Sequence, residues 1–290
     1  MSTTLTPPPQ HPVGPQPPAG AQPPAPRRES ARVISILAIV VGCVLIAGAI
    51  VSGVFSALRV ASSDERTLTA SADGIAALDV DLSTGDMLVA YGDVEEATLV
   101  VRGTGTDDWR LTRDGDTLTV RTDRSWWTGW RLWGGAENEH AALTLPQRYA
   151  ETPLDAEFSL SAGQITAEGR YGSLDIDMSA GLVTVEGTAR ELDAHLSAGR
   201  LDLELADVRT AEVEVSAGLV QGRITGTQPD AVAIDLSAGS VELVLPNGTY
   251  AVSSDVSAGG FDHTLNTSPS ASARIDVSVS AGHVVLRPER

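Results

Sequence analysis

The sequence predicts an all-β fold, a single-stranded parallel β-solenoid of about seven to eight rungs, preceded by one transmembrane α-helix and a disordered Pro-rich tail. Three observations predict this fold. A Ser-Ala-Gly motif recurs along the chain, apolar residues alternate on both sides of each motif, and a long uncharged run comes before the repeats. The 290 residues accordingly divide into a tail (1–32), a membrane helix (33–58), a linker (59–74) and a repeat domain (75–290).

The tail is rich in proline. Residues 1–26 contain ten prolines, with Gln, Ala and Gly between them. A segment with so few large apolar groups cannot offset the entropy cost of ordering, so we expect disorder with polyproline II character. Its PxxP-like spacings are an alternative recruitment signal for proline-reading domains.

The uncharged run extends from Val33 to Leu58, which is 26 residues between Arg32 and Arg59. About 20 apolar residues suffice to cross a bilayer, so the run predicts a transmembrane helix. Arg27, Arg28 and Arg32 precede it, and the positive-inside rule therefore keeps the N-terminus cytoplasmic and the C-terminal domain extracytoplasmic. This predicts a single-pass protein of the cell membrane.

Two other readings of the same run are weaker. A cleavable signal peptide has a shorter apolar stretch, of about 7 to 15 residues, followed by a small-x-small cleavage site that is missing here. The segment Val40-Val41-Gly42-Cys43 resembles a lipoprotein acylation box, but apolar residues continue for 15 positions beyond the cysteine. Because Cys43 is the only cysteine, a disulfide framework within one chain is excluded.

The repeat begins with Ser161, Ser179, Ser197, Ser216, Ser237, Ser257 and Ser280, at spacings of 18 to 23 residues. A divergent copy, Ser83-Thr84-Gly85, opens the domain. Fixed periods of this size indicate a stacked array. Apolar residues alternate before each serine, as in Leu174, Ile176 and Met178, which is the period of a strand.

The parity of this alternation switches across each motif, so the motif predicts a corner that keeps both flanking strands facing one core. Glycine is explained there if its φ is positive or if it lies against the next rung. The predicted structural corner glycines are Gly85, Gly163, Gly181, Gly199, Gly218, Gly239, Gly259 and Gly282.

The outward positions of the strands are acidic, including Asp175, Asp177, Asp193, Glu212, Glu214 and Asp235. Stacked carboxylates are an alternative Ca²⁺ site, but the glycine-rich calcium-binding nonapeptide is absent. We therefore expect a solvated face that discourages edge pairing, and no metal. Residues 59–290 carry 37 acidic residues against 17 arginines, which argues against a nucleic-acid partner.

The chain resembles the bacterial domain of unknown function 4097, the family labelled putative adhesin, over about residues 75 to 286. The resemblance rests on the repeated unit of strand, small residue, Gly and strand, on the opening segment 78–86, and on the strand-Leu-Pro elements at 143–146 and 244–248. It implies a β-solenoid-like all-β fold on cell-envelope proteins, and it supplies no catalytic residues.

No converging catalytic set is visible in the sequence, and no cofactor motif occurs. There is no G-x-S-x-G and no H-E-x-x-H, and the five histidines are scattered singly. Polysaccharide-cleaving β-helices use acids and Arg on an outer face, for which Asp175, Asp177, Asp193 and Arg200 are the candidates. We expect no enzyme.

A turn-rich insert (122–140) holds four of the five tryptophans, Trp126, Trp127, Trp130 and Trp133. On a short helix, Trp126, Trp130 and Trp133 would share one face that could cap the first rung. The alternative is a contact with the membrane surface or with sugar rings.

The sequence thus favours a membrane-anchored binding or scaffolding module that contacts cell-wall polymer, membrane lipid or an envelope protein. An envelope-stress sensor acting through a partner is the alternative function.

Overall fold

The structure, a computed structural model, describes residues 64–103, 106–122 and 139–290. These residues form strands, with two short 3-10 turns at Thr106–Asp108 and Gln147–Tyr149. The all-β prediction is confirmed. The described part of the chain contains no helix long and apolar enough to span a membrane. The Pro-rich tail, the predicted membrane helix and the tryptophans of the insert lie outside the described residues.

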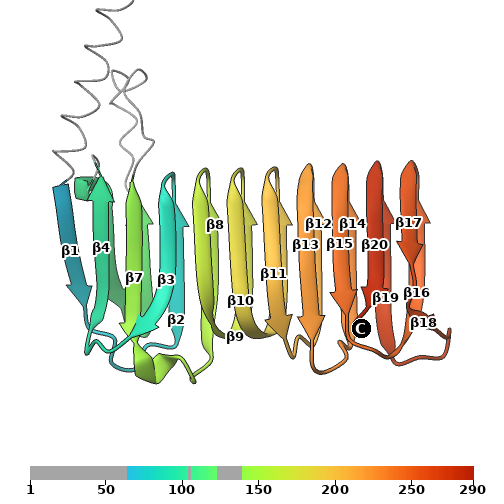
Figure 1. Cartoon of the computed structure of the whole chain (residues 1–290), viewed down its shortest axis with the longest axis horizontal. Helices are drawn as coiled ribbons and strands as arrows, with labels where there is room; N and C mark the ends of the chain where they lie inside the picture. The colour runs from blue at the N-terminus through green and yellow to red at the C-terminus, as the bar shows by residue number, and fades with distance from the viewer. Residues whose placement is uncertain (1–63, 104–105, 123–138) are drawn as a thin grey trace, which may run out of the picture. The chain divides into compact units, whose positions relative to one another are not determined.

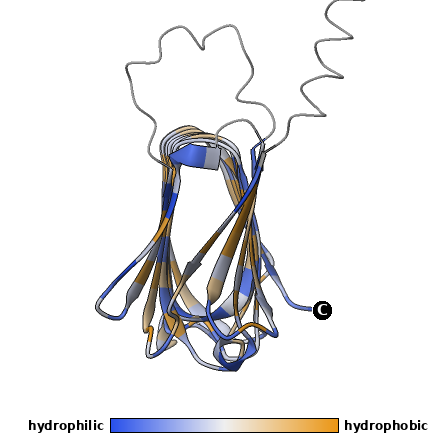
Figure 2. Cartoon of the chain, turned by 90° about the vertical axis from the view of Figure 1, so that its left-hand side faces the viewer, coloured by the Kyte–Doolittle hydropathy of each residue, from blue (hydrophilic) through white to orange (hydrophobic). Residues whose placement is uncertain are grey.

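The strands build two layers that run side by side (Figure 1), and Figure 2 shows both layers in a view along the stack. The strand before each corner lies in the first layer and the strand after it lies in the second, so one strand pair with its corner makes one rung. In the first layer the order is β6 (Thr117–Thr122), β2 (Ala77–Leu82), β8 (Leu154–Leu160), the second halves of β9 (Gln164–Met178) and β10 (Leu182–Leu196), β12 (Thr210–Val215), β14 (Ala231–Leu236), β19 (Ala273–Val279) and β16 (Thr249–Val256).

The second layer follows the same order of rungs. It contains β7 (His140–Pro146), β3 (Asp86–Gly92), the first halves of β9 and β10, β11 (Arg200–Ala206), β13 (Gly218–Thr225), β15 (Gly239–Leu245), β20 (Gly282–Pro288) and β17 (Gly259–His263). All of these strands pair in parallel with their neighbours. Eight rungs carry a predicted corner, and β6 with β7 adds one more rung that lacks the motif.

The spatial order departs from the sequence order at both ends of the stack. The rung of β6 and β7 lies outside the rung of β2 and β3, although it comes later in the chain. Likewise the rung of β19 and β20 lies between β14 and β15 on one side and β16 and β17 on the other. The repeat spacing alone does not encode these exchanges, because every rung offers the same alternating pattern to either neighbour.

The eight corner glycines stack into one column. Gly199 has φ of +105°, and a Cβ placed on it would lie 2.4 Å from the backbone oxygen of Gly181. The same contact recurs between successive corners, and Leu182 N–H donates a 3.0 Å hydrogen bond to the oxygen of Gly163. The backbone of the neighbouring rung therefore occupies the space that a side chain at the corner would need. Only glycine fits at the corners while the rungs keep their close spacing.

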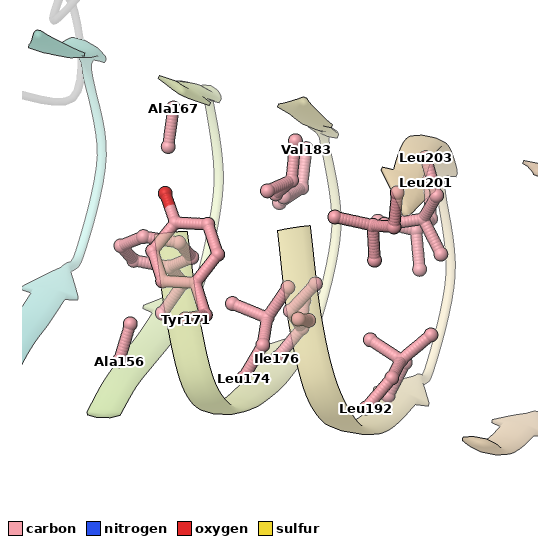
Figure 3. Close-up of a cluster of buried hydrophobic side chains, with 14 of the residues drawn as sticks. Ala156, Ala167, Tyr171, Leu174, Ile176, Val183, Leu192, Leu201 and Leu203 are labelled. Carbon is pink, nitrogen blue, oxygen red and sulfur yellow. The ribbon is translucent and has the colours of Figure 1, made fainter. Parts of the chain in front are cut away.

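The core lies between the two layers. Figure 3 shows Val183, Leu201 and Leu203 of the second layer opposite Leu174, Ile176 and Leu192 of the first. All of these side chains are buried. The alternation on both sides of the corner places them there, because successive side chains of a strand point to opposite faces.

Antiparallel strands, which the repeat does not predict, border the stack at its N-terminal end. β5 (Trp109–Asp114) pairs with β6 in the first layer, and β4 (Ala97–Gly103) pairs with β7 in the second. β1 (Asp64–Ala70) pairs with β4, so part of the segment that the sequence predicts as a linker is a strand.

Candidate functional site

The outer surface of the first layer carries a row of carboxylates that we call the acidic ladder. Its members are in register on five successive rungs: Asp79, Glu157, Asp175, Asp193 and Glu212. Burial, followed by the charges of Asp193 and Asp177, raises the pKa of Asp175. Like charges at this spacing repel one another, so the ladder disfavours anionic partners on this face.

Basic groups neutralise the ladder only in part. Arg121 Nη2 lies 3.2 Å from Asp79 Oδ2 at one end of the ladder. His195 lies between two acids, with Nδ1 3.0 Å from Asp193 Oδ1 and Nε2 3.4 Å from Glu214 Oε2. Within the described residues no group of three or more His, Cys, Asp or Glu side chains has the geometry to hold a metal ion.

The residues considered for a polysaccharide-cleaving site do not converge. Asp175, Asp177 and Asp193 belong to the outer surface of the first layer, whereas Arg200 begins β11 in the second layer. Arg200 Nε instead donates to Asp202 Oδ1 at 2.8 Å. Arg200 therefore does not lie beside the three aspartates, and these four residues do not form one site.

The outer surface of the second layer contains a hollow of about 490 Å³, which we call the Leu88 hollow. Leu88 is 47% exposed although its neighbours Met87 and Val89 in β3 are buried, because strand alternation turns Leu88 outward. Leu88 and Val256 are the two large hydrophobic side chains that are exposed in the described part of the chain. Sequence reasoning missed Leu88, since one outward leucine does not disturb the repeat pattern.

Two rows of side chains line the hollow. Val100, Ala142, Leu88 and Thr166 are in register across β4, β7, β3 and β9, and they form an apolar row that ends in a hydroxyl. Next to it, Arg102, His140, Asp86 and Gln164 form a polar row on the side of the corners. The antiparallel strand β4 supplies Val100 and Arg102, so the hollow depends on the N-terminal border of the stack.

Contacts between polar side chains hold the polar row in place. His140 Nδ1 lies 3.3 Å from Asp86 Oδ2, and Arg102 Nε donates to Glu65 Oε2 at 2.8 Å. On the far side of the hollow, Gln164 Nε2 donates to Thr166 Oγ1 at 3.2 Å. An apolar floor beside hydrogen-bonding groups suits a ligand with an apolar part and a polar part, such as an exposed side chain of a partner protein.

The four tryptophans predicted as a cap or contact lie outside the described residues, and their role stays a prediction. The fifth, Trp109, is fully buried, and its Cζ2 would lie 3.4 Å from a Cβ placed on Gly85. Its Nε1–H donates to Glu139 Oε2 at 3.3 Å. Sequence reasoning did not single out Trp109, because it stands alone outside the tryptophan cluster.

Tyr149 is a third residue that the sequence did not reveal. Its buried hydroxyl donates to the backbone oxygen of Ala72 and accepts hydrogen bonds from the backbone N–H groups of Gly74 and Ile75, at 3.0 and 3.3 Å. It thereby fixes the loop that leads into β2.

Comparison with known proteins gives a family match. The family model described as Toastrack DUF4097 matches residues 75–284, which confirms the resemblance found in the sequence. No curated protein matches the sequence.

Solved structures also align over most of the described stack. One is a putative cell adhesion protein from Clostridium sporogenes, at 10% identity and a TM-score of 0.41, with 79% of this chain and 100% of that chain covered. Another is a putative adhesin from Parabacteroides merdae, at 11% identity and a TM-score of 0.43, with 79% and 96% covered. A putative adhesin from Bacteroides fragilis aligns at 13% identity and a TM-score of 0.41, with 77% and 97% covered.

Proposed function

Since the chain belongs to the Toastrack DUF4097 family, we propose that it is a non-enzymatic binding module of the cell envelope, anchored by residues 33–58 with its β-solenoid outside the membrane. The Leu88 hollow is the binding surface in this proposal. The observation that carries it is the exposure of Leu88 beside Val100 and Ala142, on a surface whose other outward side chains are mostly polar.

The chemistry of the hollow favours a protein partner over an anionic polymer or an anionic membrane. The acidic excess of residues 59–290 repels phosphate-bearing surfaces. The apolar row provides a place for a hydrophobic side chain, and the polar row provides hydrogen-bonding groups at its rim. The proposed partner is therefore an envelope protein that presents an apolar side chain flanked by polar groups.

Cysteine labelling in intact cells tests both the orientation and the hollow. In the full chain, with Cys43 replaced by Ser, one variant carries Leu88→Cys and a control carries Glu204→Cys, which is exposed on the same layer. The reagent is a membrane-impermeant maleimide applied to intact, wall-stripped cells. The labelling rate of each variant in cells is divided by its own rate in the purified protein.

We expect Glu204→Cys to label at a similar rate in both settings and Leu88→Cys to label at least fivefold more slowly in cells, because the partner covers the hollow. Equal rate ratios for the two positions would contradict the proposal that the Leu88 hollow binds a partner. Labelling of both positions only after lysis would contradict the orientation.

A further inference from the structure

The C-terminal end of the stack is formed by β16 and β17, and their outer edges are largely unpaired among the described residues (Figure 1). β17 pairs with β20 alone. β16 pairs with β19 along one edge, while its other edge meets only the two-residue strand β18 (Asn266–Thr267), at Thr249 and Tyr250. No strand in the described part of the chain pairs with the edge of β16 beyond Tyr250, and we call this stretch the free edge.

Backbone alternation identifies which groups this free edge presents. Ser268 N–H donates to the oxygen of Tyr250, so the backbone of Tyr250 faces outward from the stack, and Ser257 N–H donates to the oxygen of Val279, so the backbone of Ser257 faces inward toward β19. Since consecutive residues of a strand direct their N–H and C=O groups to opposite edges, those of Val252, Ser254 and Val256 face the free edge. Unpaired strand edges of this kind are templates for another strand.

The free stretch is bounded on both sides. β18 occupies the edge at Tyr250, and the corner begins at Ser257, where the chain leaves the first layer. Five residues, 252–256, remain available, and Ser254 stands in their middle. Any strand that adds here has to be short and has to be centred on Ser254.

The side chains of this last rung leave the core incompletely covered. Val256 is 38% exposed, and Val252 and Phe261 are only partly buried. Their register partners one rung further in, Ile275, Val279 and Val284, are buried. One further strand on this edge would cover the exposed valines.

We propose that the free edge of β16 pairs antiparallel with β16 of a second copy of this chain, about a twofold axis through Ser254. In this register Val252 faces Val256 of the copy, Ser253 faces Asp255, and Ser254 faces Ser254. Apolar side chains thus meet at the core side, two serine hydroxyls meet on the axis, and each aspartate meets a serine rather than another acid.

Other self-pairings fail on the same geometry. Centring on Asp255 would place the two Asp255 carboxylates directly opposite each other in a non-hydrogen-bonded pair, where side chains lie closest and like charges repel. Centring on Val252 would run the copy into β18, and centring on Val256 would require the copy to continue past its own corner. A second copy of β16 fits the length, the charge pattern and the hydrogen-bonding groups of this edge, and so short an interface gives a weak dimer.

Disulfide trapping tests the register. Residues that exchange hydrogen bonds across an antiparallel pair have Cα atoms about 5.5 Å apart, which is within disulfide range. The full-length chain with Cys43 replaced by Ser, purified in mild detergent, carries Ser254→Cys. The control carries Ser278→Cys, an exposed position one rung further in. Both are oxidised under the same conditions, and the covalent dimer is followed with time.

We expect Ser254→Cys to form the dimer at least tenfold faster than Ser278→Cys. Adding Val252→Pro should reduce the rate to that of the control, because proline removes an N–H that points to the free edge and leaves the bonds to β19 intact. Equal rates for the two cysteines, or a fast Ser254→Cys reaction that Val252→Pro does not slow, would overturn the proposal. Thermal unfolding of each variant checks that the rung remains folded.

Discussion

The two ends of the stack are completed in different ways. At the N-terminal end, β5, β4 and β1 reverse direction and pair antiparallel with the outermost rung and with each other, and Trp109 fills the space beside the first corner. At the C-terminal end, β16 and β17 remain parallel to the rung before them, and among the described strands β18 alone adds to the edge. The core is therefore well covered at one end and partly exposed at the other.

A parallel rung cannot cover the core at the end of its own stack. Each added rung leaves the core uncovered at the end of the stack in the same way as the one before it, so the end has to be covered by strands, loops or helices from outside the repeat, or by another molecule. Antiparallel strands also bring side chains from outside the repeat, and Val100 and Arg102 of β4 line the Leu88 hollow for this reason. The N-terminal end, which β4 and β5 close, thus carries the candidate site. The C-terminal end, where β16 and β17 are outermost, is the open end and carries a surface for self-pairing.

Substitutions in the column of corner glycines should lower the free energy of unfolding more than any other change proposed here. The loss should be larger in the interior of the stack than at its open end. Gly199→Ala places a Cβ against the oxygen of Gly181, with fixed rungs on both sides. Backbone strain and overpacking together should cost about 2 to 6 kcal/mol in the free energy of unfolding. Gly259→Ala meets the oxygen of Gly282 in the same way but lies on the outermost rung, which can shift away. We expect it to cost less than half as much.

Gly115→Ala separates the cost of a positive φ from the cost of a steric clash between an added Cβ and the neighbouring rung. Its φ is +62°, and nothing lies within 4 Å of the added Cβ, so only the conformational cost of about 1 to 2 kcal/mol applies. Thermal and denaturant unfolding of the full-length chain measure all three variants. If Gly259→Ala and Gly199→Ala were equally damaging, the outer rung would be held as firmly as the inner ones.

Removing one aromatic side chain at each end should give the next largest difference. Trp109→Ala deletes a fully buried side chain and should cost about 3 to 5 kcal/mol, which lowers the melting temperature by roughly 10 °C for a domain of this size. Phe261→Ala deletes a partly buried side chain on the open rung and should cost about 1 kcal/mol. Similar losses for the two variants, measured by thermal unfolding at low protein concentration, would contradict the contrast between the ends.

The sequence predicts the repeating part of the molecule better than its ends. The alternation around Ser179 and Ser197 determines which side chains face the core, and the glycine at each corner follows from the close approach of the rungs. The exchanged rung order is not encoded in this way, since β19 and β16 present nearly the same pattern to β14. Pairing there depends on loop length and on the side chains of the neighbouring rungs.

The candidate site lies where the repeat stops, and this explains why the sequence did not reveal it. Leu88 becomes a site residue only because β4 places Val100 and β7 places Ala142 in the same row. The turn Asp114-Gly115-Asp116 signals the hairpin of β5 and β6. No comparable local signal shows that β4 returns to pair with β7, because about 40 residues separate them in the chain.

The smallest expected effect concerns the acidic ladder, which spans five rungs and ends before the open end. Asp175 is in register between Glu157 and Asp193, whereas Asp276, in the same outward column near the open end, is in register with Ala233 and Ser253. Burial and the charges of Asp193 and Asp177 raise the pKa of Asp175. The folded state therefore binds this proton at a higher pH than the unfolded chain does, and the charged form at neutral pH is a destabilising contribution.

The contribution of the Asp175 carboxyl to the free energy of unfolding should thus increase as the pH falls from 7 through the raised pKa of Asp175 toward its ordinary pKa of 3.8. Asp175→Asn removes the charge, so at pH 7 the variant should melt about 1 °C above the parent chain, as suits a surface substitution. This difference in melting temperature between Asp175→Asn and the parent chain, which we call the gap, should shrink as the pH is lowered. Asp276→Asn, which lacks acidic register partners, should show no such pH-dependent gap. A constant gap for Asp175→Asn between pH 7 and pH 4, or an equal gap for both variants, would show that repulsion along the ladder does not set the stability of the middle rungs.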